Sequence, residues 1–145
     1  MIDLSALDEV GVDPLTRTAR VGPGAMLHAF DTEAQKHGLA TTAGACSRVG
    51  IGGLTLGGGT GYLVRKFGLT IDNLLAADVV TADGGCIRAS EEEHPDLLWA
   101  LRGGGGNFGV VTAFEFKLHP VGPEVVAGQV VHRLEDARDA LRFYS

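Results

Sequence analysis

The sequence is poor in the residues and segments that several common classes of protein require. It has two cysteines, Cys46 and Cys86, among 145 residues, too few for a disulfide framework or a cysteine-rich zinc site. No apolar run approaches the roughly 18 residues of a membrane span, and residues 1–10 lack the basic region and apolar core of a signal peptide. We therefore expect a cytoplasmic protein without a membrane partner or a metal site.

Basic residues are also scarce. The chain has 12 Lys and Arg against 18 Asp and Glu, a formal net charge of −6. Nucleic-acid binding depends on clustered Lys and Arg, so we expect no nucleic-acid partner. The length is that of one domain of about 100–150 residues, and a hydrophobic content of 45% is typical of a globular protein.

Glycine is the residue that the chain has in excess, with 22 copies against an average of about 7%. Many gather in two clusters, "GACSRVGIGGLTLGGGTGYLVRKFG" at 44–68 and "RGGGGNFGVV" at 102–111. Two explanations stay open from composition: surface loops, or backbone that approaches a flat or phosphorylated ligand with no Cβ in the way. The ligand-binding explanation is favoured because apolar residues stand between the glycines of the first cluster, whereas a solvated linker would carry polar residues there. These apolar residues are Val49, Ile51, Leu54 and Leu56.

The second cluster contains a G-x-G-x-x-G pattern made of Gly104, Gly106 and Gly109. A dinucleotide fingerprint needs a strand before this pattern and a helix after it, because the helix N-terminus holds the pyrophosphate. Here the expected order is reversed, since a helix ends at Arg102 and a β-rich run begins at Val110. A Rossmann site is therefore excluded, and the absence of Gly-Lys-Ser/Thr excludes a phosphate-binding P-loop.

The periodicity predicts an α+β fold with antiparallel hairpins rather than a repeating βαβ series. The expected helices cover 26–37, a short segment from about residue 60, 91–103 and 135–145. The expected strands cover 2–7, 16–21, 109–118 and 124–134, with a hairpin over 74–90 that turns at Asp83-Gly84.

Residues 44–84 and the later "HPDLLWALRGGGGNFGVVTAFEFKLHP" resemble the FAD-linked oxidases of the berberine-bridge-enzyme-like group, in the vanillyl-alcohol-oxidase superfamily. The resemblance runs from about Ile2 to Pro123. It implies the second subdomain of a PCMH-type FAD-binding domain, a mixed or antiparallel sheet flanked by helices, with FAD extended and held chiefly by backbone. For the intact enzyme it implies an oxidoreductase that transfers a hydride from a C–H bond of a small-molecule substrate to flavin N5.

Carried over position by position, the resemblance implies a cofactor site built mainly from backbone. Its flavin and pyrophosphate side would consist of Gly44, Ala45, Cys46, Val49, Gly50, Gly52 and Gly53. Further along the cofactor would lie Leu54, Gly58, Gly59, Tyr62, Gly109, Val110 and Val111.

Cys46 stands where many members of this family bond FAD covalently through a thioether to flavin C6. Without the resemblance, a small cysteine would be interpreted as inert core packing. The sequence departs from the family at Ser47, where such members often have proline, and at Leu54, where they often have histidine. Cys86, on the expected hairpin, is interpreted as structural.

Family members begin with a further subdomain that carries an Arg-Gly-Gly-His type motif and continue into a substrate domain with a catalytic base. This sequence contains neither, so no catalytic residue is assigned. We expect residues 1–123 to be part of the FAD-binding domain and residues 124–145 to be the start of a truncated substrate domain. Two functions follow: a piece of an FAD-dependent oxidoreductase, completed by other chain segments or a complementing chain, or a non-catalytic remnant that binds FAD poorly or only associates with a partner or with itself.

Overall fold

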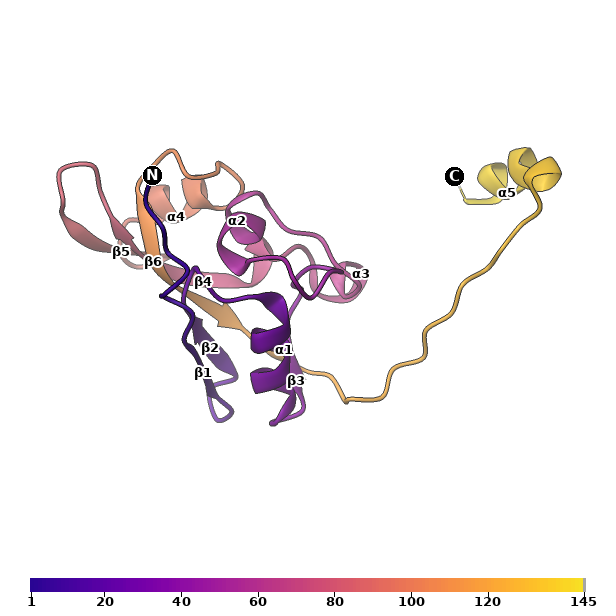
Figure 1. Ribbon diagram of the computed structural model, residues 1–145, viewed down its shortest axis with the longest axis horizontal. Coiled ribbons are helices and arrows are strands. Elements are labelled where there is room, and N and C mark those ends of the chain that lie inside the picture. The colour runs from indigo at the N-terminus through magenta and orange to yellow at the C-terminus, as the bar shows by residue number, and fades with distance from the viewer. Residues whose placement is uncertain (145) are drawn as a thin grey trace.

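The computed structural model describes residues 1–144 and contains a five-stranded antiparallel sheet (Figure 1). Its strand order is β1-β2-β6-β4-β5, so the long strand β6 pairs with β2 on one side and β4 on the other. The strands are β1 (Val10–Asp13), β2 (Thr18–Val21), β4 (Leu74–Val80), β5 (Cys86–Ser90) and β6 (Val110–Lys117). A small second sheet pairs β3 (Leu39–Ala40) with β7 (His119–Pro120).

The helices account for the α part of the predicted α+β fold, which is confirmed. They are α1 (Leu27–Gln35), α2 (Ile51–Leu56), α3 (Val64–Phe67), α4 (Pro95–Leu101) and α5 (Ala137–Tyr144), with 3₁₀ turns η1 (Ile71–Asn73) and η2 (Leu134–Asp136). Pro95 lies in the first turn of α4, where its missing amide proton costs nothing. Gly38 follows α1 with φ of 64°, the left-handed conformation that commonly ends a helix.

The core lies between one face of the sheet and the helices α1, α2 and α4. Ala19 and Val21 alternate with exposed Arg20 along β2, the pattern of a sheet that is buried on one side. On that side Phe30 of α1 packs against Phe116 of β6, with their ring centroids 5.6 Å apart. Residues from α1, α2, α4 and the sheet all belong to this one core cluster.

The opposite face of the sheet is charged and faces solvent. Asp78 of β4 pairs with Arg20 of β2 and with Arg88 of β5, and Arg88 also pairs with Glu115 of β6. These ion pairs link four of the five strands. Cross-strand pairs of opposite charge are typical of the solvent-facing side of an antiparallel sheet.

The predicted hairpin is confirmed. Strands β4 and β5 pair from Ala76–Ser90 to Val80–Cys86, and Gly84 at the turn has φ of 84°. The predicted helices at 26–37 and 91–103 and the strands at 16–21 and 109–118 are also present with shorter bounds. The order helix, glycine cluster, strand is observed around Gly104–Gly109, as the exclusion of a Rossmann site required.

Two predicted strands are wrong. Residues 2–7 form a turn, in which the Leu7 amide donates to Leu4 O at 2.9 Å and the Ser5 amide donates to Asp3 Oδ1 at 2.9 Å. The Asp3 side chain thus offers the backbone a local bond in place of a strand ladder.

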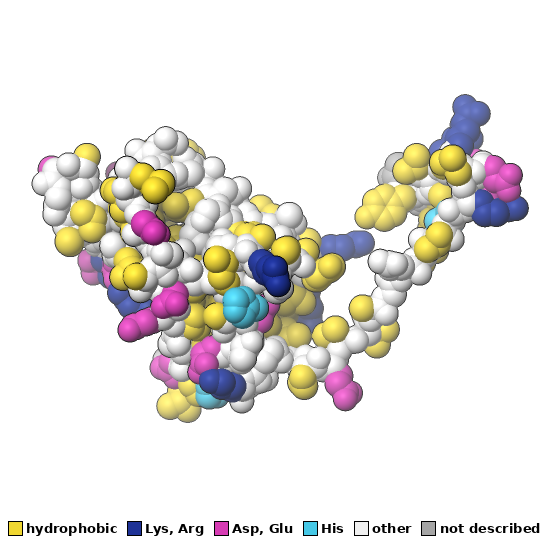
Figure 2. All heavy atoms as spheres, viewed as in Figure 1, with side chains coloured by type: hydrophobic (Ala, Val, Ile, Leu, Met, Phe, Trp, Pro, Cys, Tyr) yellow, Lys and Arg dark blue, Asp and Glu magenta, His cyan; other side chains and the backbone are white. Residues whose placement is uncertain are grey.

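The strand predicted at 124–134 is not formed either. These residues run away from the body towards α5 (Figure 1) and pair with no described strand. Their valine side chains, such as Val126 and Val131, are exposed, and Figure 2 shows hydrophobic side chains along this segment. A β-favouring sequence needs a neighbouring strand to satisfy its amides, and residues 1–144 supply none at this place.

Candidate functional site

The two glycine clusters meet in space. The first contributes α2 and the second contributes the loop between α4 and β6, and the Gly105 amide joins them by donating to Leu56 O at 3.0 Å. Between them lies a hollow of about 260 Å³, open to solvent. The residues around it are Ile2, Leu4, Pro23, Gly52, Gly53, Leu56, Gly106, Gly109, Val110, Val111 and Phe114.

Some of these glycines are required by the packing of the chain itself. A Cβ on Gly52 would lie 2.8 Å from Pro23 O. Gly109 has φ of 144°, and a Cβ there would lie 2.7 Å from both Val79 Cγ1 and Val80 O. Such close backbone approaches admit only glycine, so these positions would be glycine with or without a ligand.

Gly53 and Gly106 are different. Apart from the adjacent residues and, at Gly53, the backbone of α2 itself, no atom lies within 4 Å of the position that a Cβ would occupy at either residue, and both line the hollow. Neither has a positive φ. Inside α2 a glycine costs about 1 kcal/mol relative to alanine, and nothing in the chain offsets that cost at Gly53. Glycine here keeps the backbone accessible from the hollow.

The loop that precedes α2 is fixed to the start of α1. The amides of Leu27 and His28 donate to Val49 O and Ser47 O, both at 3.0 Å, and the Ile51 amide donates to Ala25 O at 2.9 Å. The loop carbonyls thereby satisfy amides that the first turn of a helix otherwise leaves free. A loop held in this way has a defined conformation without any ligand.

Cys46 lies on this anchored loop, and its thiol is free and exposed. Core packing, the interpretation that composition alone favours for a small cysteine, is therefore excluded. Cys46 is not among the residues that line the hollow. Cys86 is also free and exposed, at the start of β5.

The glycine turn after α2 is bonded to the segment around η1. The Thr70 amide donates to Gly59 O at 2.9 Å and the Ile71 amide donates to Gly58 O at 3.1 Å. Gly58 and Gly59 have φ of 104° and 71°, values that side chains other than glycine rarely adopt. The turn is therefore held from one side by η1.

His119, in β7, lies behind the same segment. Its Nε2 is 2.7 Å from Asn73 Oδ1, and its ring stacks on Phe67 with centroids 4.0 Å apart. Burial lowers the pKa of His119 below its usual 6.5, and the positive charges of Lys117 and Lys66 lower it further. The neutral ring is thus the favoured form at this place.

The structure brings together only part of the predicted cofactor site. Gly52, Gly53, Gly109, Val110 and Val111 share the hollow. The remaining predicted residues lie outside it, in the anchored loop, in α2 and in the segment between α2 and α3: Gly44, Ala45, Cys46, Val49, Gly50, Leu54, Gly58, Gly59 and Tyr62. Tyr62 is 87% exposed, whereas Leu54 is partly buried against the core.

Sequence reasoning missed several residues of the hollow. Ile2, Leu4, Pro23, Leu56 and Phe114 line it, but as apolar residues they look like ordinary core positions. Gly106 could have been found, because it belongs to the second glycine cluster next to Gly109.

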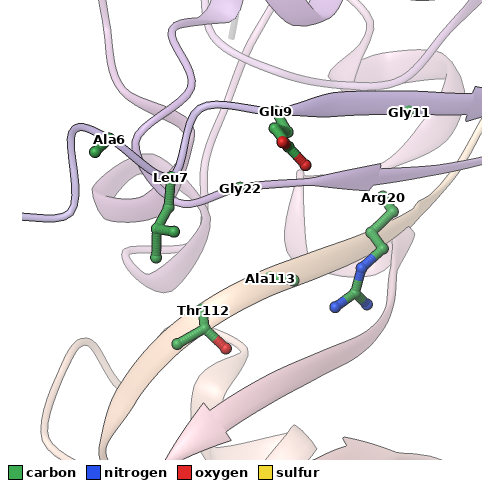
Figure 3. A pocket seen from close by; sticks show the side chains of 8 residues that line it. All are labelled: Ala6, Leu7, Glu9, Gly11, Arg20, Gly22, Thr112 and Ala113. Atoms are coloured by element: carbon green, nitrogen blue, oxygen red, sulfur yellow. The ribbon is translucent and has the colours of Figure 1, made fainter.

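A second hollow, of about 360 Å³, lies on the charged face of the sheet (Figure 3). Figure 3 shows Arg20 and Thr112 projecting from β2 and β6 into it, with Glu9 nearby. Arg20 is already paired with Asp78, and apart from Gly11 and Gly22 no glycine lines this hollow. It offers no backbone cradle of the kind found between the two clusters.

Within residues 1–144, no three His, Cys, Asp or Glu side chains lie close enough together to hold a metal ion. In the same part of the chain, none of the helices has both the length and the apolar character needed to cross a bilayer.

Comparison with known proteins gives concordant results. The model of the family described as FAD binding domain matches residues 1–90. Berberine bridge enzyme-like 24 of Arabidopsis thaliana is 44% identical over an alignment 145 residues long, which covers 95% of this chain and 26% of that protein.

Two solved structures have closely similar folds. Xylooligosaccharide oxidase from Myceliophthora thermophila C1, in complex with xylobiose, superposes with a TM-score of 0.79 and 44% identity over 82% of this chain and 25% of that one. Glucooligosaccharide oxidase from Acremonium strictum, studied for its 6-S-cysteinyl, 8α-N1-histidyl FAD, gives a TM-score of 0.78 and 42% identity over 81% and 25% of the two chains. The chain thus spans about a quarter of the length of these relatives.

Proposed function

The chain belongs to the FAD-binding domain family of the berberine-bridge-enzyme-like and related FAD-linked oxidases, and we propose that it forms one wall of the FAD site in such an oxidoreductase. The observation that carries this proposal is the hollow between the glycine clusters, where Gly53 and Gly106 keep the backbone open without any packing reason. A planar ring and a pyrophosphate both bind well against amides that no Cβ covers.

The size of the hollow fits a wall rather than a whole site. Its volume of about 260 Å³ lies below the roughly 300–1,000 Å³ of pockets that enclose drug-sized ligands. FAD is larger than such ligands, so this chain would contact only part of it. We propose that residues 1–123 belong to the FAD-binding domain, that residues 124–145 begin the substrate domain, and that substrate and catalytic base are held elsewhere in the complete enzyme.

In this proposal the backbone positions the cofactor. The hollow would take one part of it against Gly53, Gly106 and Gly109, and the anchored loop and the glycine turn would extend the surface on which it lies. Bound FAD supplies the hydride acceptor, N5 of the flavin, for oxidation of a substrate C–H bond. The chain's own contribution is to hold and orient the ring and to exclude water from the covered side.

Cys46 is proposed as a covalent attachment point. Its thiol is exposed and free, and the loop that carries it accepts two backbone hydrogen bonds from the first residues of α1. Attachment would replace the hydrogen of flavin C6 by the Cys46 sulfur. The hydrogen of the thiol and the hydrogen of C6 would leave as protons, and dioxygen would be the oxidant that takes the two electrons.

Two free, exposed cysteines also fit a reducing compartment, which supports a cytoplasmic location.

Uptake of FAD by the purified chain tests the proposal. The chain incubated with FAD and freed of unbound cofactor should keep the visible flavin absorption band. If Cys46 is the attachment point, part of the colour should remain with the protein after acid precipitation and should be released in the Cys46→Ala variant. Cys86→Ala is the matched control, since Cys86 is equally free and exposed. A chain that takes up no FAD would contradict the proposal.

A second candidate function is association with another chain without catalysis. The specific observation in its favour is the row of exposed apolar side chains between β7 and the end of α5 (Figure 2), among them Val126, Val131 and Phe143. A colourless chain that forms a stable complex with itself or with a complementing chain would favour this function over the first.

A further inference from the structure

A hydrogen-bonded pair of side chains, buried Asn73 and half-buried His119, lies next to the segment that binds the glycine turn. Asn73 is 2% exposed, and its Nδ2 donates to Phe67 O and Leu69 O, both at 2.9 Å. Because both acceptors are carbonyls, the Oδ1 atom must face His119, and His119 Nε2 must carry the proton that it donates. Both polar atoms of the Asn73 side chain therefore have hydrogen-bond partners.

The segment that Asn73 holds is the one that binds the glycine turn. The backbone amide of Asn73 donates to Thr70 O at 3.1 Å, and Thr70 and Ile71 in turn donate to Gly59 O and Gly58 O. A Cβ on Gly59 would collide with the Thr70 side chain, so the turn and η1 fit closely. An unbroken path of bonds thus runs from Asn73 to Gly58 and Gly59.

His119 fixes the other end of this path. It pairs with Ala40 between β7 and β3, directly after β6, the central strand of the large sheet. Its ring also lies nearly parallel to Phe67, at 7°. The imidazole is therefore held by backbone pairing and by stacking before it bonds to Asn73.

We propose that Asn73 and His119, here called the latch, position the turn at Gly58 and Gly59 for FAD binding. The inference rests on the proposed function of the chain. Both are positioning residues, since they act through the turn. A turn that is already ordered loses less conformational freedom when a ligand binds, so the latch should raise the affinity for FAD without a contact of its own.

A merely structural role would predict a different result. A buried asparagine and a half-buried histidine can contribute to global stability alone, and then their loss would affect every amide in proportion. The latch predicts a local effect, because the Thr70 and Ile71 amides exchange with solvent when the turn opens, whereas Val79 and Phe114 in the sheet exchange on global unfolding.

Two substitutions separate the donor from the ring. His119→Gln keeps an N–H that can donate to Asn73 but loses the stacked imidazole. His119→Phe keeps a ring for Phe67 but has no donor. His37→Gln is the matched control, because His37 is an exposed histidine beyond the end of α1. Asn73→Ala removes the whole network and serves as a second test if His119→Phe folds poorly.

Hydrogen exchange without FAD and a titration with FAD test the latch. We expect exchange of the Thr70 and Ile71 amides to be about tenfold faster in His119→Phe, as for the loss of a hydrogen bond, and close to the native rate in His119→Gln and His37→Gln. The FAD dissociation constant should rise about tenfold in His119→Phe and recover in His119→Gln.

Exchange at Thr70 and Ile71 that is unchanged in His119→Phe would overturn the proposal. So would faster exchange with unchanged FAD affinity, because the turn would then not need to be held. If the unaltered chain takes up no FAD, the proposed function fails, while the exchange rates still decide whether the latch orders the turn.

Discussion

Two adjacent glycines of α2 should respond oppositely to the same substitution. Gly52 and Gly53 are neighbours in one helix, and both line the hollow. A methyl group on Gly52 would lie 2.8 Å from Pro23 O, whereas at Gly53 no atom outside the backbone of α2 and the adjacent residues lies within 4 Å of the methyl position. Alanine at these two positions therefore separates the packing of the chain from the accessibility of its backbone.

The magnitudes follow from these environments. Gly53→Ala should stabilise the fold by roughly 0.5–1 kcal/mol, because alanine loses less conformational freedom and favours the helix. Gly52→Ala should destabilise it by about 1–3 kcal/mol, the usual cost of overpacking. For a chain of this size, each kcal/mol shifts Tm by about 4 °C.

Binding should change in a different direction from stability at Gly53. The added methyl group enters the space proposed for FAD, so Gly53→Ala should weaken FAD binding about tenfold, or 1.4 kcal/mol, while raising Tm. Urea unfolding gives the stability and titration of flavin fluorescence gives the affinity. A Gly53→Ala variant that is both more stable and binds FAD as tightly as the native chain would refute the role of the hollow.

Other substitutions probe the neighbouring elements. Gly109→Ala should cost more than about 2 kcal/mol, because Gly109 has φ of 144° and a Cβ would press on Val79; thermal unfolding measures this loss, and a native-like Tm would contradict it. Stability should fall as pH is lowered from about 6.5, because the folded pKa of His119 lies below its unfolded value of 6.5 and the unfolded chain then binds more protons; urea unfolding across this range should show a flatter profile in His119→Gln, and parallel profiles would refute the assignment. Asp78→Asn should change stability by less than about 1 kcal/mol, because its ion pairs lie on the solvent face; a larger loss in urea unfolding would mean that this network is structural.

The strongly patterned elements could be predicted from the sequence. The helix at Pro95–Leu101 has a proline at its start and a leucine face, and the hairpin at Asp83-Gly84 has a turn sequence that admits positive φ. In both, local conformational preference and tertiary packing favour the same structure.

Other elements depend on contacts that a sequence does not display. Helix α2 contains two glycines and was not predicted, yet Ile51 and Thr55 are fully buried in it, so tertiary packing overrides a poor helix propensity. The reverse holds for residues 124–134: their sequence favours β structure, but no described strand pairs with them, so no strand forms.

The candidate site was predictable as a region and not as a set of contacts. The apolar residues within the first cluster and the family resemblance predict that both glycine clusters serve a cofactor, and the structure brings part of each cluster to one hollow. Whether a glycine is required by packing, as at Gly52, or leaves backbone open, as at Gly53, depends on the position of Pro23. The distance between the Gly52 Cβ position and Pro23 O is set by the fold, and no pattern in the sequence around Gly52 predicts it.

Hydrogen exchange of the whole chain with and without saturating FAD tests the central claim most directly. The account predicts that FAD protects amides in both glycine clusters, at residues 50–59 and 104–111, while the amides around the hollow on the charged face, such as those of Gly11 and Arg20, exchange as before. Protection confined to one cluster, or located on the charged face instead, would contradict a shared FAD cradle.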